Sequence, residues 1–222
     1  MKRWVVLLAL MLPALTASGQ DAVPRDEHQM HRVHRDPKAY ISMLEDPQRD
    51  AYQKPHEVLT ALGIKQGEMI ADIGAGSGYF TFRLAHHAGE NGKVYAVDVN
   101  PDMILHLNRR IRELKARNVV SILAAADDPL LSAHSVDRFF FCDSWHHIRA
   151  QTKYLSLVRK MLKPGGEVIM IDFHKRKQPV GPPLPMRIAR EDLLQQMESH
   201  GFQLKQEHTF LPYQYFLVFV PK

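Results

Sequence analysis

The sequence predicts an α/β fold in which strands and helices alternate along most of the chain. From Met69 onward, short apolar runs alternate with segments that carry apolar residues at helical spacing. A glycine-rich turn, Gly74 to Gly78, joins the first apolar run to the first of these segments. Two strand-like runs at the C-terminus suit an antiparallel hairpin. This pattern implies a mostly parallel sheet with a ligand crevice at the carboxyl ends of its strands.

The N-terminus carries the three-part pattern of a secretory signal peptide. Lys2 and Arg3 precede an apolar stretch from Trp4 to Leu15, and the small residues Ala17-Ser18-Gly19 follow. The stretch is too short for a membrane span. An amphipathic helix is the alternative, although no polar residue interrupts the apolar run. We therefore expect residues 1–19 to be removed and the mature protein to be secreted or periplasmic, without stable membrane insertion.

Residues 20–55 are predicted to form an N-terminal arm with short helices. The segment from Gln20 to Asp36 is polar and lacks an apolar period. Three histidines recur in it at every third residue: His28, His31 and His34. Exposed histidines in a linker are usually solvated, so we predict no metal site. From Pro37 to Leu62 the pattern indicates two short helices, divided at Asp46-Pro47.

Seven apolar runs are predicted to be strands. They are Met69–Ile73, Lys93–Val97, Val119–Leu123, Asp137–Cys142, Gly166–Phe173, Phe202–Phe210 and Tyr213–Val220. Four helices are expected between them, at Gly78–His87, from Pro101 onward, at Arg149–Leu162 and at Glu191–His200. Pro101 suits the first turn of a helix, and apolar residues follow it at helical spacing as far as Leu114. Gly201 ends the last helix.

Composition and charge exclude several classes of function. The chain has 222 residues, 45% of them hydrophobic and 24% charged, as in ordinary globular domains. Loss of Lys2 and Arg3 leaves 27 basic against 24 acidic residues, a net charge of +3. That balance is too mild to indicate a nucleic-acid partner. The single cysteine, Cys142, cannot form an internal disulfide, and its place at a strand end predicts a buried, inert thiol.

The turn after the first strand is built to bring backbone close to a ligand. Asp72 ends the strand, and Gly74, Gly76 and Gly78 follow at alternate positions. Glycine allows backbone dihedrals that other residues avoid, and it leaves no side chain between the main chain and a ligand. A nicotinamide-binding fingerprint would read Gly-x-Gly-x-x-Gly, but here Tyr79 stands where the third glycine would be. The spacing disfavours a nicotinamide dehydrogenase.

A second motif makes the signal more specific. The run Val94 to Asp98 is a buried strand that ends in an acid, and a carboxylate there can accept hydrogen bonds from both ribose hydroxyls. With these two motifs and the turn at 162–167, the chain resembles the class I S-adenosylmethionine-dependent methyltransferases, particularly the small-molecule and quinone-biosynthesis kind. The resemblance covers residues 56–222. It implies a Rossmann-like, doubly wound sheet of order 3-2-1-4-5-7-6 with an antiparallel C-terminal hairpin.

The resemblance also assigns residues to the cofactor, S-adenosyl-L-methionine. Asp72 and the three glycines would hold its amino-acid end, and Asp98 its ribose. Val99 and Met103 would pack on the adenine, although either suits an ordinary core. The family usually has an acid after the third strand, where this chain has Ala125. Asp127 can take over that contact through a shifted turn; the alternative is that the backbone and the neighbouring Ala126 make it. Tyr52 and Gln53 are further contacts implied by the family, with helix packing an equal alternative.

The end of the fourth strand faces the transferable methyl group in this family. His146 and His147 follow that strand, and an imidazole there could remove a proton from the methyl acceptor. We predict His147 as the base and His146 as the less favoured neighbour, against the alternative that either one is structural. Trp145 and Tyr79 are expected to shape an apolar mouth.

A basic, proline-rich stretch from His174 to Pro185 follows the fifth strand and is expected to select the substrate. A solvated charge run is the alternative explanation. The sequence thus predicts a methyltransferase that moves a methyl group to an O, N or C atom of a small molecule. An exported protein that binds S-adenosylmethionine or a nucleoside without catalysis is the alternative. The acceptor and the oligomeric state stay open.

Overall fold

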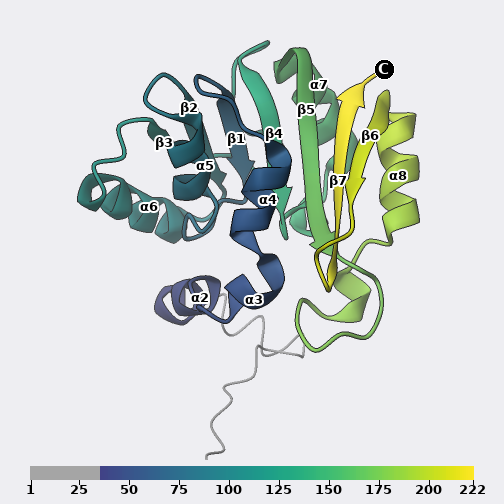
Figure 1. The fold of residues 1–222 in the computed structure, drawn as a ribbon, viewed down its shortest axis with the longest axis horizontal. Helices are drawn as coiled ribbons and strands as arrows, with labels where there is room; N and C mark the ends of the chain where they lie inside the picture. The colour runs from purple at the N-terminus through teal and green to yellow at the C-terminus, as the bar shows by residue number, and fades with distance from the viewer. Residues whose placement is uncertain (1–35) are drawn as a thin grey trace, which may run out of the picture.

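The computed structural model describes residues 36–222, so the predicted signal peptide and residues 20–35 of the N-terminal arm lie outside the described residues. One sheet of seven strands forms the centre of the molecule, with the spatial order β3-β2-β1-β4-β5-β7-β6 (Figure 1). The strands are β1 Met69–Ile73, β2 Lys93–Asp98, β3 Val119–Leu123, β4 Val136–Cys142, β5 Leu162–Phe173, β6 Phe202–His208 and β7 Gln214–Pro221. The predicted order is confirmed.

One strand, β7, runs opposite to the other six. The first five strands pair in parallel, and β7 runs antiparallel to both β5 and β6. The register aligns Ile73 with Val97 on one side and with Phe141 on the other. The residues that follow β1, β2 and β4 therefore meet at one edge of the sheet. Ligands bind at this edge in open parallel sheets.

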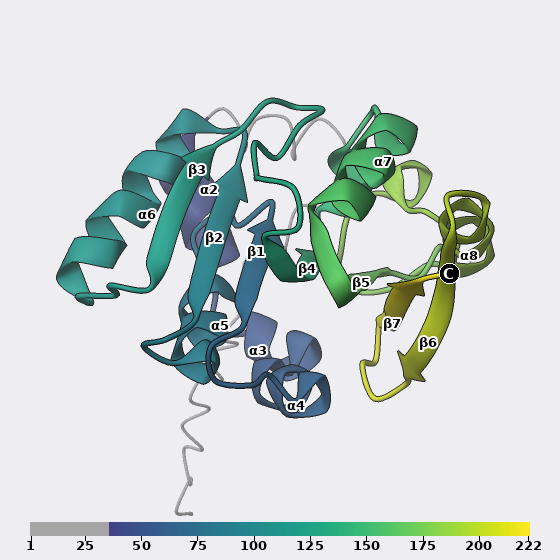
Figure 2. The same ribbon diagram turned by 90° about the horizontal axis from the view of Figure 1, so that it is seen from above.

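The helices cover both faces of the sheet. They are α2 Pro37–Leu44, α3 Arg49–Gln53, α4 Pro55–Leu62, α5 Thr81–Ala88, α6 Pro101–Glu113, α7 Gln151–Met161 and α8 Arg190–Ser199, with short 3-10 turns at Trp145–His147 and Leu184–Met186. Figure 2 shows α4 and α5 on one side of the sheet and α7 and α8 on the other. Among residues 36–222, no helix is long and apolar enough to cross a membrane.

The two faces have separate hydrophobic cores, since side chains alternate along a strand. Ile70 and Phe140 face the core that contains α4, α5 and Leu107 of α6. Ala71 and Phe141 face the opposite core, beneath α7 and α8. Strands buried on both faces read as continuous apolar runs, which is why the sequence revealed them.

Three local features differ from the sequence prediction. The segment before β1 forms three helices rather than two, because Lys54 adopts a left-handed φ of 44° and separates α3 from α4. Helix α5 begins at Thr81 rather than Gly78, whose φ of 86° is incompatible with a helix. Strand β5 begins at Leu162, so it includes the turn expected before it; the pairing with β4 is irregular there.

Candidate functional site

A cleft of about 330 Å³ lies at the carboxyl edge of the sheet. It is formed by the loop after β1, the ends of β2 and β3, and the segment after β4. Eight of the residues predicted as functional line it: Asp72, Gly74, Gly76, Tyr79, Asp98, Val99, Ala126 and His147. Figure 1 shows α2 and α3 below this edge, on the same side as the loop between β5 and α8. The parallel strands thus bring residues from distant parts of the sequence into one cavity.

Close packing explains two of the glycines. Gly74 has a φ of 72°, and a Cβ there would lie 2.5 Å from Cβ of Ser144. Gly78 has a φ of 86°, and its Cβ would lie 2.6 Å from the ring of Phe82. Gly78 does not line the cleft. Its role in the structure is the tight turn into α5, while Gly74 lets the loops after β1 and β4 approach each other.

Asp98 is held at the cleft by backbone donors. Its two carboxylate oxygens accept from the amides of Gly76, at 2.8 Å, and Asn100, at 2.9 Å. The residue is 9% exposed. Burial raises the pKa of Asp98, although these backbone donors oppose the shift. A carboxylate oxygen can accept more than one hydrogen bond, so the fixed group can still accept from a ligand.

Asp72 lies deeper and has a neutral partner. The Thr81 hydroxyl donates to it at 2.6 Å, and the residue is 4% exposed. Burial raises the pKa of Asp72 to about 7, with Asp98 adding to the shift and the Thr81 hydrogen bond opposing it. A nearby cation favours the ionised form of such a carboxyl group. This end of the cleft therefore suits a positively charged ligand group.

Other predicted contacts lie away from the cleft lining. Met103 is 1% exposed and lies on the buried face of α6. Asp127 forms an exposed ion pair with Lys153 at 2.6 Å. Trp145 was expected at the mouth, but it is buried, and its indole nitrogen donates to Gln196. Apolar residues with helical spacing fit core and ligand contact equally well, which explains the first of these differences.

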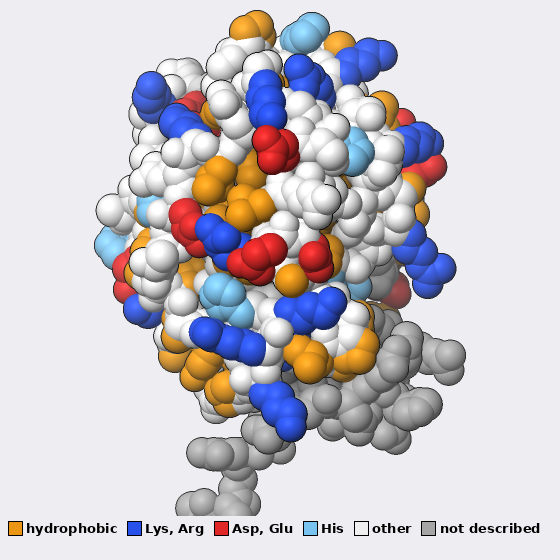
Figure 3. Space-filling view, turned by 90° about the vertical axis from the view of Figure 1, so that its right-hand side faces the viewer, with side chains coloured by type: hydrophobic (Ala, Val, Ile, Leu, Met, Phe, Trp, Pro, Cys, Tyr) orange, Lys and Arg blue, Asp and Glu red, His pale blue; other side chains and the backbone are white. Residues whose placement is uncertain are grey.

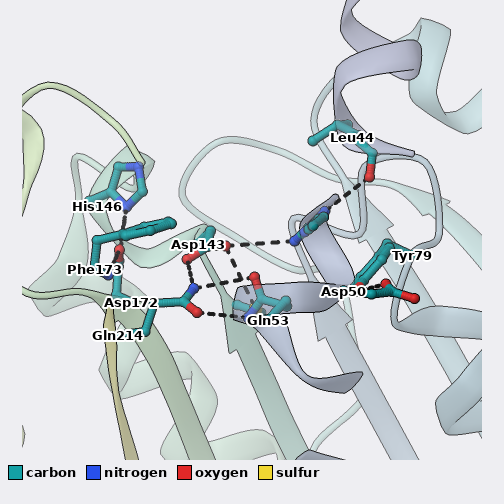
Figure 4. Close-up of polar contacts among 11 residues, drawn as sticks. Leu44, Asp50, Gln53, Tyr79, Asp143, His146, Asp172, Phe173 and Gln214 are labelled. Carbon is teal, nitrogen blue, oxygen red and sulfur yellow. Dashed lines mark hydrogen bonds and ion pairs between the residues drawn. The ribbon is translucent and has the colours of Figure 1, made fainter. Parts of the chain in front are cut away.

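Helices α2 and α3 supply cleft residues that the sequence did not single out. Tyr40, Leu44 and Arg49 line the cleft. The Arg49 guanidinium lies 3.6 Å from a carboxylate oxygen of Asp143 and 4.1 Å from the ring centre of Tyr79. It also donates to the carbonyl of Leu44 at 3.2 Å (Figure 4). Tyr79 was expected at the mouth of the site, and it lines the cleft beneath Arg49.

A buried polar network connects α3 with the ends of β4 and β7 (Figure 4). Gln214 donates to Asp143 at 2.6 Å, and Gln53 donates to Gln214 at 3.1 Å. Burial raises the pKa of Asp143 to about 6, although Arg49 opposes the shift. Gln53 also contacts the sulfur of Cys142, a free and buried thiol as predicted, whose pKa burial raises. Gln53 thus links α3 to Cys142 and Gln214 through hydrogen bonds, and it does not line the cleft.

The two histidines have different surroundings. His146 pairs through Nδ1 with Asp172 at 2.8 Å, and each side chain is 2% exposed. Burial lowers the pKa of His146, but the charge and hydrogen bond of Asp172 outweigh it, so the net shift is upward. His147 is exposed and lies beside it, with ring centres 4.2 Å apart. The sequence favoured His147 as the base, and His146 is a further candidate because Asp172 orients its imidazole ring.

A second, smaller cavity of about 170 Å³ adjoins the cleft. We call it the side cavity. It shares with the cleft Tyr40, Leu44, Arg49, Asp143 and His147, and it is further lined by Met43, Asp46, Gln48, Tyr52, His146, Phe173, Val180, Gly181 and Pro182. Tyr52, one of the contacts implied by the resemblance, lies here with its ring centre 6.0 Å from that of Phe173. Both histidines thus border this space.

The loop after β5 reaches the side cavity through its apolar part. Val180, Gly181 and Pro182 line the cavity, whereas Lys175, Arg176 and Lys177 are exposed. Figure 3 shows the side of the molecule that carries α8, where basic and apolar side chains intermingle on the lower part. Among the described residues, no group of three or more acidic, histidine or cysteine residues is placed to hold a metal ion. The three histidines of the arm lie outside that range.

Comparison with known proteins shows the family of the chain. Residues 64–211 match a family model described as a methyltransferase domain. The ubiquinone/menaquinone biosynthesis C-methyltransferase of Escherichia fergusonii is 26% identical over 114 residues, which cover 51% of this chain and 45% of the relative. The chain thus spans about half the length of the curated relatives it matches.

Solved structures extend the likeness over most of the fold. An S-adenosylmethionine-dependent methyltransferase from Aquifex aeolicus is 27% identical, with a TM-score of 0.78, covering 83% of this chain and 97% of that one. A putative type 11 methyltransferase from Sulfolobus solfataricus is 26% identical, with a TM-score of 0.63, covering 76% and 92%. Both likenesses extend over more than three quarters of this chain.

Proposed function

The chain belongs to the family of methyltransferase domains, and we propose that it is an enzyme that transfers a methyl group from S-adenosylmethionine to a small-molecule acceptor. One observation carries the proposal. The acidic ends of β1 and β2 and the glycine loop between them line the same cleft, and the His146–Asp172 pair borders the cavity beside it. Cofactor and acceptor would then meet where the two cavities join.

The cleft residues fit the chemical groups of the cofactor. Asp98 would accept from the ribose hydroxyls, and Asp72 would face the ammonium group. Val99 and Ala126 would pack against the adenine. Two further observations support this fit: the hydroxyls of Ser77 and Ser144 are buried at the cleft, with no hydrogen-bond partner among the described residues. Buried hydroxyls normally have partners, and a bound ligand would supply them.

S-adenosylmethionine supplies a methyl group that its sulfonium already activates. The task left to the chain is to hold the acceptor in line and, for a weakly acidic nucleophile, to take its proton. Asp172 binds Nδ1 of His146, which leaves Nε2 for a proton from a molecule in the side cavity. His147 borders both cavities and would contact the acceptor or the methyl group. The acceptor atom can be oxygen, nitrogen or an acidic carbon.

We also propose that residues 1–19 direct export and that the mature enzyme works outside the cytosol. The proposal rests on the sequence pattern of Lys2, Arg3 and the apolar run after them. On this proposal the chain consists of the signal peptide, the arm of residues 20–55 and the methyltransferase domain of residues 56–222.

Radiolabelled methyl transfer tests the enzymatic function. The purified protein is incubated with methyl-labelled S-adenosylmethionine and a fractionated metabolite extract. We expect at least one labelled small-molecule product, which should disappear with Asp98→Ala. A protein that binds the cofactor but labels no fraction of any extract would instead support binding without catalysis.

A further inference from the structure

The loop between β5 and α8 is folded around a buried guanidinium. Arg187, at the end of this loop, is 6% exposed. Its donors contact five oxygens of the loop: the carbonyls of Pro182 at 2.7 Å, His174 at 3.2 Å, Arg176 at 2.8 Å and Val180 at 3.1 Å, and the side-chain oxygen of Gln178 at 2.7 Å. Within residues 36–222, Arg187 has no carboxylate at ion-pair distance. Its positive charge is therefore solvated by the loop itself.

Arginine is suited to this role by its shape. The carbonyls of an irregular loop have no partners in a strand or helix, and buried carbonyls need donors. A guanidinium offers five N–H groups in a rigid planar fork. A lysine has three donors on one atom, so it cannot reach oxygens that are spread around a plane. The fold of this loop and the presence of Arg187 therefore depend on each other.

The same loop forms one wall of the side cavity. Val180 and Pro182, whose carbonyls accept from Arg187, both line the cavity, as does Gly181 between them. Gly181 has a φ of 99°, and a Cβ there would lie 2.5 Å from the ring of Phe173. The Arg187 guanidinium lies 5.4 Å from the centre of that ring. Arg187 thus fixes this wall while it does not itself line the cavity.

We propose that Arg187 is a positioning residue that sets the shape of the side cavity and thereby selects the acceptor. This inference rests on the proposed methyl transfer. The wall it holds is apolar, and the cavity is small. The site accordingly takes compact acceptors with an apolar body and one weakly acidic group that reaches His146. The exposed side chains of Lys175, Arg176 and Lys177 do not line the cavity, so this run contributes to the wall only through the Arg176 carbonyl that Arg187 binds.

Proteolysis tests whether Arg187 holds the loop. Wild type, Arg187→Lys and Arg187→Met are digested with trypsin in the presence of S-adenosylhomocysteine, and cleavage after residues 175–177 is followed by mass spectrometry. We expect cleavage to be about ten-fold faster in both variants, since the loop opens more often. Arg190→Lys is the matched control, because Arg190 bonds Glu207 rather than the loop carbonyls. Cleavage of Arg187→Lys at the wild-type rate would overturn the proposal.

The pattern of labelled products tests whether the loop selects the acceptor. In the extract assay, both Arg187 variants should lose or change products while calorimetry shows nearly unchanged S-adenosylhomocysteine affinity. A third variant, Arg187→Ala, leaves space for a free guanidinium ion. Guanidinium ions at a concentration far below the denaturing range should restore the wild-type products to this variant. If the Arg187 variants do not fold, Gln178→Leu serves instead, because it removes an oxygen that Arg187 binds without changing the cavity lining. It should alter the products in the same way, and unchanged products would overturn the proposal.

The experiments distinguish an error in the role of Arg187 from an error in the methyltransferase function on which that role rests. A wild type that makes labelled products, together with variants that make the same products at the same KM, would overturn only the role of Arg187. A wild type that binds no S-adenosylhomocysteine would overturn the methyltransferase function, and acceptor selection with it.

Discussion

Three carboxyl groups beside the cleft have pKa values above their ordinary range. Burial raises the pKa of Asp72 to about 7 and that of Asp143 to about 6, and it also raises the pKa of Asp98. Arg49 opposes the shift at Asp143 through its ion pair. A carboxyl group with a raised pKa is costly to ionise unless a cation joins it. The cleft can therefore compensate the positive charge of a bound cofactor.

Asp72→Asn should stabilise the ligand-free protein at neutral and alkaline pH. The pKa of this carboxyl is about 7 when folded and about 4 when unfolded, so the folded state binds more protons between these values and stability falls as pH rises through them. At pH 8 we expect a gain of about 1–2 kcal/mol, or roughly 2–8 °C in Tm. Scanning calorimetry at pH 4 and pH 8 measures it. If the Tm of the variant differed from that of the wild type by the same amount at both pH values, the raised pKa of Asp72 would be contradicted.

The proton acceptor can be identified by comparing the two histidines. His146→Gln should lower kcat by about 10²–10⁴ for a weakly acidic acceptor, with cofactor affinity nearly unchanged, whereas His147→Gln should have the smaller effect. Since Asp172 raises the pKa of His146, the rate should rise with pH through a value above histidine's usual 6.5 or so. Asp172→Asn should move that rise to lower pH. A larger loss with His147→Gln would make His147 the base.

Residues with distant partners were the hardest to predict from the sequence. The glycines, Asp72 and Asp98 could be identified because each belongs to a local motif. Asp172 pairs with a histidine 26 positions away, and Gln53 and Gln214 are separated by 161 positions. Side chains such as Arg49 resemble ordinary solvated charges until the fold brings their partners close. Local pattern carries no information about these pairs.

At the scale of elements, the short helices α2 and α3 cover the mouth of the cleft. They are held by Arg49 at the Asp143 carboxylate and by Glu45, which lies 3.0 Å from both His106 and Arg110 of α6. A Cβ at Gly76 would lie 3.0 Å from a methyl carbon of Leu44, so α2 packs closely on the glycine loop. These contacts enclose whatever binds in the cleft.

Arg49→Gln should loosen this cover. It leaves the Asp143 carboxyl without its cation in a buried place, and loss of one partner of such a pair costs about 3 kcal/mol. Arg83→Gln is the control, since Arg83 also pairs with α3, through Asp50, but both side chains are well exposed. The control should lose less than about 1 kcal/mol. Urea unfolding measures both, and equal losses would contradict the anchoring role of Arg49.

Elements could be predicted where their own residues determine them. The bounds of β1 and β3 are as the apolar runs indicated, and α6 begins at the expected proline. The break between α3 and α4 was missed, because Lys54 takes a left-handed conformation that lysine rarely adopts. Pro55 was the local signal for it, since the residue before a proline is disfavoured in a helix. The structure of the loop after β5 could not be predicted either, since it depends on the long-range bonds of Arg187.

At the scale of the molecule, the strand order brings the functional loops together. Strands β1 and β4 are neighbours at the point where the order reverses, and the cleft lies at their carboxyl ends. Alternating strands and helices predicted the parallel sheet, but only the family resemblance supplied its order. The antiparallel β6–β7 hairpin completes the sheet and positions Gln214 against Asp143.

Export can be tested on the whole chain in a Gram-negative host. The protein should be recovered outside the inner membrane, and its intact mass should be lower by about twenty residues. Lys2→Glu with Arg3→Glu should reduce processing, because the charged start of the segment is removed. Recovery of a purely cytosolic protein that keeps residues 1–19 would contradict export and leave the enzymatic function intact.

Calorimetric titration of the purified protein with S-adenosylhomocysteine tests the central claim most directly. We expect saturable binding to the wild type, and weaker binding to Asp98→Ala by about ten- to a hundred-fold, since hydrogen bonds to a charged acceptor are worth roughly 1.5–3 kcal/mol. Asp127→Ala, at the exposed pair with Lys153, should leave the affinity nearly unchanged. Tight binding of NAD, with no affinity for S-adenosylmethionine or S-adenosylhomocysteine, would contradict the account.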